Sequence, residues 1–280
     1  MTGDPLIAVS VEDVSKVYEP PPPMRLRRLF SRLGGLHIED GFAADALAGQ
    51  IEDDDDELEE AEPQDDEVLA QREEPVARRV IDRVTLQAHA GSIIALVGPE
   101  GGGKTVLLKL IGGIVAPSSG RIVVRGTVAP ALNAMALVLP SRGHTVRAAL
   151  PQLGSMVGIA PHTVRSRFDD IIDLMGTPGL LKSSTSLMES RRKRELILAM
   201  ALSLEPDVLL CDVAIGQDAF GDRCVERIER LQAGGTLVIA EMRNLFKWRL
   251  RHDRLVLFDR GAILSDEVGA GELPVVRGPG

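Results

Sequence analysis

Hydrophobic and polar positions follow two kinds of pattern along this chain. In residues 7–18 apolar and polar side chains alternate, and in residues 80–86 the alternation resumes, which predicts a strand in each segment. Apolar side chains run together in residues 93–97, 208–211 and 236–240. Runs of this length bounded by polar residues predict strands that are buried on both faces.

Segments with helical spacing separate these strands. The predicted helices cover residues 106–111, 163–175, 189–204 and 220–231. Residues 121–125 form a further predicted strand, and residues 255–264 a hairpin that turns at Asp259-Arg260-Gly261. The alternation predicts an α/β fold with a helix-rich middle, and we find no internal repeat.

The most specific motif follows the first buried run. Gly98-Pro99-Glu100-Gly101-Gly102-Gly103-Lys104-Thr105 fits G-x-x-x-x-G-K-[ST] and lies between a predicted strand and a predicted helix. Glycines let backbone N–H groups converge on phosphate oxygens, and the helix N-terminus adds its dipole. Lys104 is then predicted to reach the β- and γ-phosphates, and the Thr105 hydroxyl to hold Mg²⁺. A glycine turn beside an unrelated lysine is the alternative.

The composition narrows the class of protein. The 280 residues are 44% hydrophobic, enough for a substantial core, which must be aliphatic because aromatic residues make up only 3%. The two cysteines, Cys211 and Cys224, are too few for a disulfide framework, which fits a reducing compartment. We expect no signal peptide at residues 1–5 and no membrane span, because no stretch approaches roughly 18 uncharged apolar residues.

The net charge of −9 comes from one segment. Residues 52–67 hold twelve acidic residues and no basic one, and the remaining 32 basic and 29 acidic residues leave a charge of +3. We predict that residues 19–76 are an insertion within one domain, with a basic helix at 24–33 and a disordered acidic run at 52–67. The acidic run is either a solvated tether or a segment that docks on a basic surface. The basic helix is a candidate for contact with a membrane surface.

A second acidic motif accompanies the glycine loop. P-loop proteins place an acidic residue at the end of a neighbouring strand, where it completes the Mg²⁺ shell. Asp212 follows the apolar run at 208–211 and is the predicted residue. An aspartate that only begins a loop is the alternative.

Further motifs resemble those of the nucleotide-binding subunit of an ATP-binding cassette (ABC) transporter. Pro117-Ser118-Ser119-Gly120 resembles the family's P-x-S-G turn, residues 204–210 its L-x-P-x-x-L-L segment, and residues 253–261 its D-R-x-x-x-L-x-x-G hairpin. Residues 215–220 together with Cys224 are similar to a segment of the branch that exports capsular polysaccharide, O-antigen and teichoic acid. The resemblance covers residues 6–18 and 78–270.

The resemblance implies a P-loop NTPase fold of ABC type, with a mixed sheet core, a helical subdomain and a small antiparallel β part. Residues 1–18 and 77–270 would form this domain, with the helical subdomain at about 140–205 and a tail at 271–280. The implied ligands are ATP and Mg²⁺, with Thr105 and Asp212 at the metal. The implied nucleotide contacts are Tyr18, which stacks on adenine, Gly98, Gly101, Gly102, Gly103, Lys104, Thr105 and Val106. An ordinary exposed tyrosine is the alternative for Tyr18.

Several residues on which the family depends for hydrolysis are replaced. Val213 stands where the family has the glutamate that polarises the attacking water, and valine has no proton acceptor. Glu241 or Met242 stands where the family has a histidine that contacts the γ-phosphate. Residues 188–192 lack the glycines of the L-S-G-G-Q-like segment, and no glutamine lies near residues 134–138. The basic residues 191–194 are either a remade phosphate clamp or a solvated helix start.

From these features we expect an ATP-binding subunit of an ABC-type polysaccharide exporter that binds MgATP with weak or no hydrolysis, and we assign no catalytic residue. The resemblance implies a membrane permease as partner at the cytoplasmic face of the plasma membrane. It also implies a homodimer or a heterodimer with a paralogous ABC ATPase, and no nucleic acid. A nucleotide-gated regulatory or scaffold protein is one alternative, and a chain that binds no nucleotide is another.

Overall fold

The structure, a computed structural model, describes residues 6–18, 77–139, 143–242 and 251–269. The chain divides into a larger unit, residues 1–16 and 80–280, and a smaller unit, residues 17–79. The predicted basic helix at 24–33 and acidic run at 52–67 lie outside the described residues.

An antiparallel sheet contains the two segments whose side chains alternate in polarity. Its order is β2-β1-β4, formed by β1 (Ile7–Tyr18), β2 (Arg78–His89) and β4 (Ser119–Val124), and β1 runs antiparallel to β4. Val9 and Val11 are fully buried, whereas Glu12 between the strand's apolar positions is exposed. These strands confirm the predictions made for residues 7–18, 80–86 and 121–125.

The second sheet has the order β5-β6-β7-β3-β8-β9 in the part of the chain that the structure describes. The five strands from β5 to β8 are parallel to their neighbours, and β9 returns antiparallel to β8 as the predicted hairpin. Every residue of β3, β6 and β7 is buried, as expected of parallel strands that are covered on both faces. The strands are β3 (Ile93–Val97), β5 (Val128–Ala131), β6 (Val208–Cys211), β7 (Leu237–Glu241), β8 (Arg254–Asp259) and β9 (Ala262–Val268).

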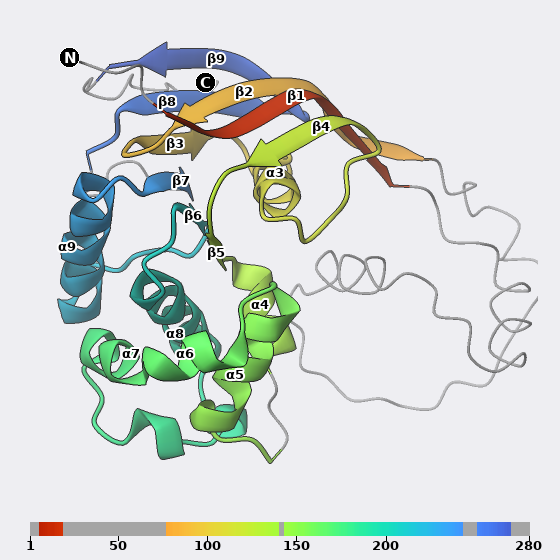
Figure 1. Cartoon of the computed structure of the whole chain (residues 1–280). Helices are drawn as coiled ribbons and strands as arrows, with labels where there is room; N and C mark the ends of the chain where they lie inside the picture. The colour runs from red at the N-terminus through yellow and green to blue at the C-terminus, as the bar shows by residue number, and fades with distance from the viewer. Residues whose placement is uncertain (1–5, 19–76, 140–142, 243–250, 270–280) are drawn as a thin grey trace, which may run out of the picture. The chain divides into compact units, whose positions relative to one another are not determined.

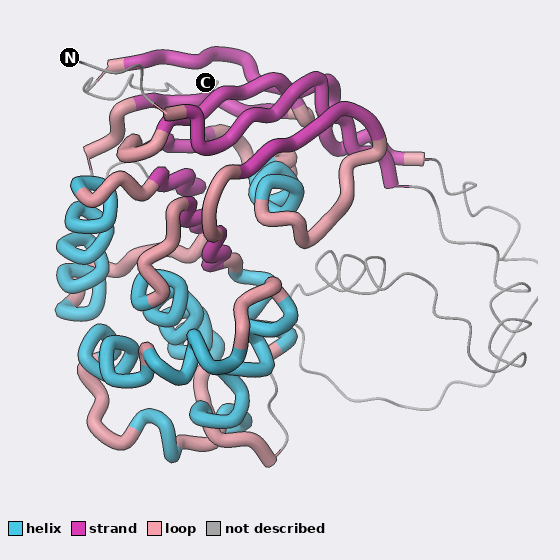
Figure 2. The backbone as a smooth tube through the Cα atoms, viewed as in Figure 1, coloured by secondary structure: helices cyan, strands magenta, loops and turns pink. Residues whose placement is uncertain are grey.

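The helices of the described residues fall into three places. Helix α3 lies beneath β4, α9 lies beside β7, and α4 to α8 gather below the sheets in Figure 1. Figure 2 shows the same helical group as cyan coils apart from the magenta strands. The helices are α3 (Lys104–Ile111), α4 (Asn133–Val138), α5 (Val146–Met156), α6 (Pro161–Ser166), α7 (Phe168–Met175), α8 (Ser190–Ser203) and α9 (Ala219–Ala233), with 3-10 turns η2 (Leu180–Lys182) and η3 (Thr185–Leu187).

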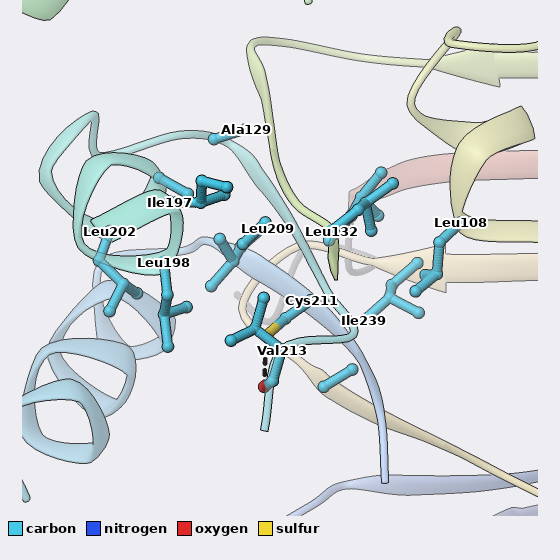
Figure 3. Close-up of a cluster of buried hydrophobic side chains, with 14 of the residues drawn as sticks. Leu108, Ala129, Leu132, Ile197, Leu198, Leu202, Leu209, Cys211, Val213 and Ile239 are labelled. Atoms are coloured by element: carbon cyan, nitrogen blue, oxygen red, sulfur yellow. Dashed lines mark hydrogen bonds between the residues drawn. The ribbon is translucent and has the colours of Figure 1, made fainter. Parts of the chain in front are cut away.

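Helix α8 joins the helical group to the sheet. Its residues from Glu195 to Ser203 are all buried, and it packs against β5 and β6. Figure 3 shows Leu198 and Leu202 of this helix facing Leu209 of β6. The second half of α8 is apolar on all sides, and a helical segment of this kind belongs in a core.

Three helical segments differ from the sequence-based expectation. Helix α4 is not among the predicted helices. Residues 163–175, predicted as one helix, form α6 and α7, because Arg167 leaves helical geometry (φ −106°, ψ 10°) and its guanidinium bonds Glu205 at 2.8 Å. Helix α5 was not predicted, since Pro151 interrupts its pattern. Burial of Leu150 and Leu153 stabilises the helix despite the proline.

Candidate functional site

Residues 98–105 form the loop that connects β3 to α3. Gly98 has φ +141°, and a Cβ built on it would lie 1.9 Å from the carbonyl oxygen of Phe258 in β8. Gly103 has φ +103°, and its Cβ would lie 2.9 Å from the carbonyl oxygen of Val80 in β2. Only glycine fits either position, because side chains would meet backbone on both sides of the loop.

The other predicted contact residues continue the same loop into the helix. The Gly102 N–H donates to Pro99 O at 3.3 Å, and Gly102 O accepts from the Gly261 N–H at 2.9 Å. No described atom lies within 4 Å of a Cβ built on Gly101, so this glycine faces open space. Val106 lies half-buried in the first turn of α3. A hydrogen bond therefore holds the loop to the β8–β9 turn at Gly102, whereas the space beside Gly101 is open.

Lys104 turns back over the loop that precedes it. Its ammonium Nζ donates to Gly98 O at 2.9 Å and to Pro99 O at 2.6 Å, and the side chain is 3% exposed. Glu241 Oε1 lies 3.6 Å from the same nitrogen. A buried ammonium requires a counter-charge, and Glu241 supplies it.

Glu241 also bonds Thr105, the other functional side chain of the loop. The Thr105 hydroxyl donates to Glu241 Oε2 at 3.1 Å. Glu241 is the last residue of β7 and is paired with Leu96 of β3, which ends just before the loop. Sequence reasoning treated Glu241 only as a replacement for a histidine and missed this contact. The signal was a carboxylate at the end of an otherwise apolar strand.

Asp212 follows β6 on the other side of β7. It is 3% exposed, its Oδ1 accepts from the Asn133 N–H at 2.5 Å, and its carbonyl oxygen accepts from the Asn133 side-chain amide at 2.9 Å. These bonds fix the carboxylate against the start of α4. Burial, together with the charges of Asp212 and Glu241, raises the pKa of the Cys211 thiol to about 12.

Val213 and Met242 are buried among apolar groups. Val213 is 2% exposed, and its carbonyl oxygen accepts a hydrogen bond from the Cys211 thiol at 3.5 Å (Figure 3). Met242 packs in a small cluster with Ala95, Val97 and Leu255. Neither side chain contains a group that takes up a proton at neutral pH.

The basic start of α8 is occupied by ion pairs. Arg191 Nε lies 2.9 Å from Glu195 Oε1, and its terminal nitrogen also pairs with Asp218. Arg192 pairs with Glu195 Oε2 at 2.9 Å and donates to the Thr177 hydroxyl. Both arginines line a pocket of about 390 Å³. The Arg191 side chain is 65% exposed and none of residues 191–194 is buried, which agrees with a solvated helix start. The phosphate clamp stays a prediction.

Two further predictions concern Tyr18 and the segment at residues 134–138. Tyr18, the last residue of β1, belongs to the smaller unit, and its contact with adenine stays a prediction. The segment at 134–138, where no glutamine was found, is helix α4, and its first residue is Asn133. Asn133 was not among the site residues predicted from the sequence. The available signal was its side-chain amide, one position before residues 134–138.

Metal-binding clusters and membrane-spanning helices are both absent from the part of the chain that the structure describes. The described residues contain no group of three or more His, Cys, Asp or Glu side chains placed to hold a metal ion. None of the helices in these residues is long and apolar enough to cross a membrane.

Known proteins resemble this chain in sequence and in fold. Residues 81–215 match the family model described as ABC transporter. The chain is 32% identical over 170 residues to the zinc import ATP-binding protein ZnuC of Jannaschia sp. (strain CCS1), a match that covers 59% of this chain and 67% of ZnuC. It is 26% identical over 195 residues to the teichoic acids export ATP-binding protein TagH of Levilactobacillus brevis, covering 69% of this chain and 52% of TagH.

The fold resembles that of a solved ATP-binding cassette. The dimeric, post-hydrolysis structure of MJ0796 bound to ADP and Pi gives a TM-score of 0.63 at 12% identity, covering 93% of this chain and 98% of that chain. This similarity confirms the predicted fold class. The chain spans about half to three fifths of the length of several curated relatives, including that TagH protein. The chain belongs to the ABC transporter family of ATP-binding proteins.

Proposed function

We propose that this chain is the ATP-binding subunit of an ABC-type exporter of a polysaccharide or related polymer, and that it binds MgATP with weak or no hydrolysis. One observation carries the proposal. The loop at residues 98–105 holds Lys104 and Thr105 together beside the sheet, whereas Val213, directly after Asp212, is buried and apolar.

The loop residues suit a triphosphate. Backbone N–H groups in the first turn of α3 would donate to phosphate oxygens, and the Lys104 ammonium would leave the carbonyl oxygens of Gly98 and Pro99 and bind phosphate oxygens instead. Thr105 and Asp212 would hold Mg²⁺, which neutralises part of the phosphate charge when it is bound. The hydroxyl–carboxylate pair of Thr105 and Glu241 fits such an ion, because Mg²⁺ prefers oxygen ligands.

Slow hydrolysis follows from the groups that are missing. A positioned general base typically contributes about 10²–10⁴ in rate, and Val213 cannot act as one. Met242 is enclosed by Ala95, Val97 and Leu255 and offers no hydrogen bond to a γ-phosphate. We therefore assign no catalytic residue.

The exporter branch is supported by residues 215–220 with Cys224 and by the similarity to a TagH protein. An exporter of this kind would place the chain against a membrane permease at the cytoplasmic face of the membrane, as a homodimer or a heterodimer with a related ATPase. A nucleotide-gated regulatory or scaffold role is the second candidate.

Calorimetric titration tests nucleotide binding. We expect the purified full-length chain to bind MgATP with nanomolar to micromolar affinity, and Lys104→Ala to lose at least about 100-fold of it, since a charge-assisted contact to phosphate is removed. Val138→Ala, in the exposed part of α4, is the matched control and should bind as the unmodified chain does. Absence of binding by the unmodified chain would leave a protein that binds no nucleotide.

Phosphate release in saturating MgATP tests the second half of the proposal. We expect turnover far below one per second. A rate of a few per second or more from the purified chain would contradict it. Co-purification with an integral membrane protein encoded by an adjacent gene would favour the exporter over the regulatory role.

A further inference from the structure

We infer that Glu241 is a direct ligand of the Mg²⁺ ion that accompanies the nucleotide, beside Thr105 and Asp212. The inference rests on the proposed binding of MgATP and extends it to a residue that the ABC resemblance does not place at the metal. It gives a function to a buried carboxylate that otherwise lies against a phosphate-binding loop with the wrong sign of charge.

The spacing of two oxygen atoms fits a shared cation. Thr105 Oγ1 and Glu241 Oε2 are 3.1 Å apart. Ligands of Mg²⁺ lie at about 2.0–2.1 Å in octahedral geometry, so adjacent ligand oxygens are separated by about 2.9 Å. The two side chains therefore already have nearly the separation of neighbouring ligands.

The order of the strands brings a second carboxylate to the same edge. Strand β7 lies between β6 and β3, and Cys211 of β6 is paired with Ala240 of β7. Asp212 and Glu241 come directly after these paired residues, and neighbouring strands lie about 4.8 Å apart. The Asn133 N–H holds the Asp212 carboxylate on the side of α4, so Glu241 is the carboxylate that already lies at the Thr105 hydroxyl.

The charge balance also favours a cation at Glu241. The carboxylate is 5% exposed and lies 3.6 Å from the Lys104 ammonium. When Lys104 turns to phosphate oxygens, Glu241 loses its counter-charge and faces further negative charge, an arrangement that is costly in a buried site. A divalent ion between the carboxylate and the phosphates removes this repulsion.

The chemistry of the site suits Mg²⁺ held jointly with a nucleotide. Mg²⁺ is usually bound through one or two carboxylates plus substrate phosphates, and not by a cage made only of protein ligands. Thr105 and Glu241 would supply protein oxygens to such an ion, and the phosphates the remainder of its shell.

The test is a titration of the full-length chain with ATP, once with Mg²⁺ and once with a chelator. For the unmodified chain we expect tighter binding with Mg²⁺. For Glu241→Gln we expect a loss of about 10-fold or more in affinity for MgATP, with metal-free ATP binding unchanged or improved, because loss of a ligand weakens the metal-dependent part alone.

A second variant guards against loss of folding. Glu241→Asp keeps the charge and should retain part of the preference for Mg²⁺, and thermal unfolding verifies that both variants are folded. Glu241→Gln that binds MgATP as tightly as the unmodified chain, or more tightly, would overturn the inference and leave Glu241 as a counter-ion of Lys104. An unmodified chain that binds ATP neither with nor without metal would instead refute the proposed function itself.

Discussion

Gly98 lies where β3 passes into the loop, at a position where a single methyl group meets the backbone of another strand. Its φ of +141° is rarely adopted by other residues, and a Cβ would come within 1.9 Å of the Phe258 carbonyl oxygen. The clash involves backbone on both sides, so no rotation of a side chain relieves it. Position 98 therefore accepts only glycine, because the backbone of β8 lies too close for any side chain.

We expect Gly98→Ala to lower the free energy of unfolding by about 3 kcal/mol or more, because either the loop or β8 must move. Gly101→Ala is the matched control within the same loop. No described atom lies within 4 Å of its added Cβ, so only the left-handed φ of +73° opposes it, at a cost of about 1 kcal/mol. Urea unfolding of both variants measures the difference, and equal costs would contradict the geometric argument.

At the scale of elements, the junction of α8 with α9 depends on Asp218. This residue is the N-cap of α9, and its side chain accepts from the Gly221 N–H at 2.9 Å. Its carboxylate also pairs with Arg191 at the start of α8. Asp218 therefore caps the N-terminus of α9 and also links α9 to α8.

We expect Asp218→Ala to lower the free energy of unfolding by about 1 kcal/mol, the usual cost of losing an N-cap, and Asp218→Asn to lose less than half of that. The Gly221 N–H, and then Arg191, lower the pKa of Asp218 below its ordinary value of 3.8. The folded state therefore favours the carboxylate, and its contribution is complete above 3.8 and is lost as the pH falls through the lowered pKa.

Chemical unfolding at pH 7 and in steps below pH 4 measures this dependence. The difference between the unmodified chain and Asp218→Asn should shrink as the pH falls. A difference that is constant with pH would mean that the ionised form of Asp218 contributes nothing to the junction.

At the scale of the whole molecule, the loop at 98–105 contacts both sheets. It meets Val80 of β2 at Gly103, and β8 and its hairpin at Phe258 and Gly261. A ligand bound to this loop therefore stabilises strands from both sheets, and its binding energy should appear in global unfolding.

We expect MgATP at about 100 times its dissociation constant to add about 2.7 kcal/mol to the free energy of unfolding. For a domain of this size that corresponds to a rise of about 5–10 °C in Tm. Differential scanning calorimetry with and without MgATP measures the shift, and Lys104→Ala should abolish it. An unchanged Tm in the unmodified chain would contradict binding at the loop.

Much of the fold could be predicted from the sequence, because local patterns determine it. The apolar runs at 93–97 and 208–211 coincide with β3 and β6, and the Asp259-Arg260-Gly261 turn forms the hairpin. Helix α5 and the break at Arg167 could not be predicted, since burial and a distant ion pair decide them.

The sequence by itself determined the glycine loop at residues 98–105 and pointed to the family, because glycine spacing and a strand–loop–helix order are local properties of the chain. Only the tertiary structure decided that Glu241 lies against Lys104 and Thr105, and that Arg191 pairs with Asp218. These contacts join residues more than twenty positions apart, and for Glu241 more than a hundred. Which strands are neighbours in the sheet decides the position of Glu241, and no local pattern in the chain contains that order.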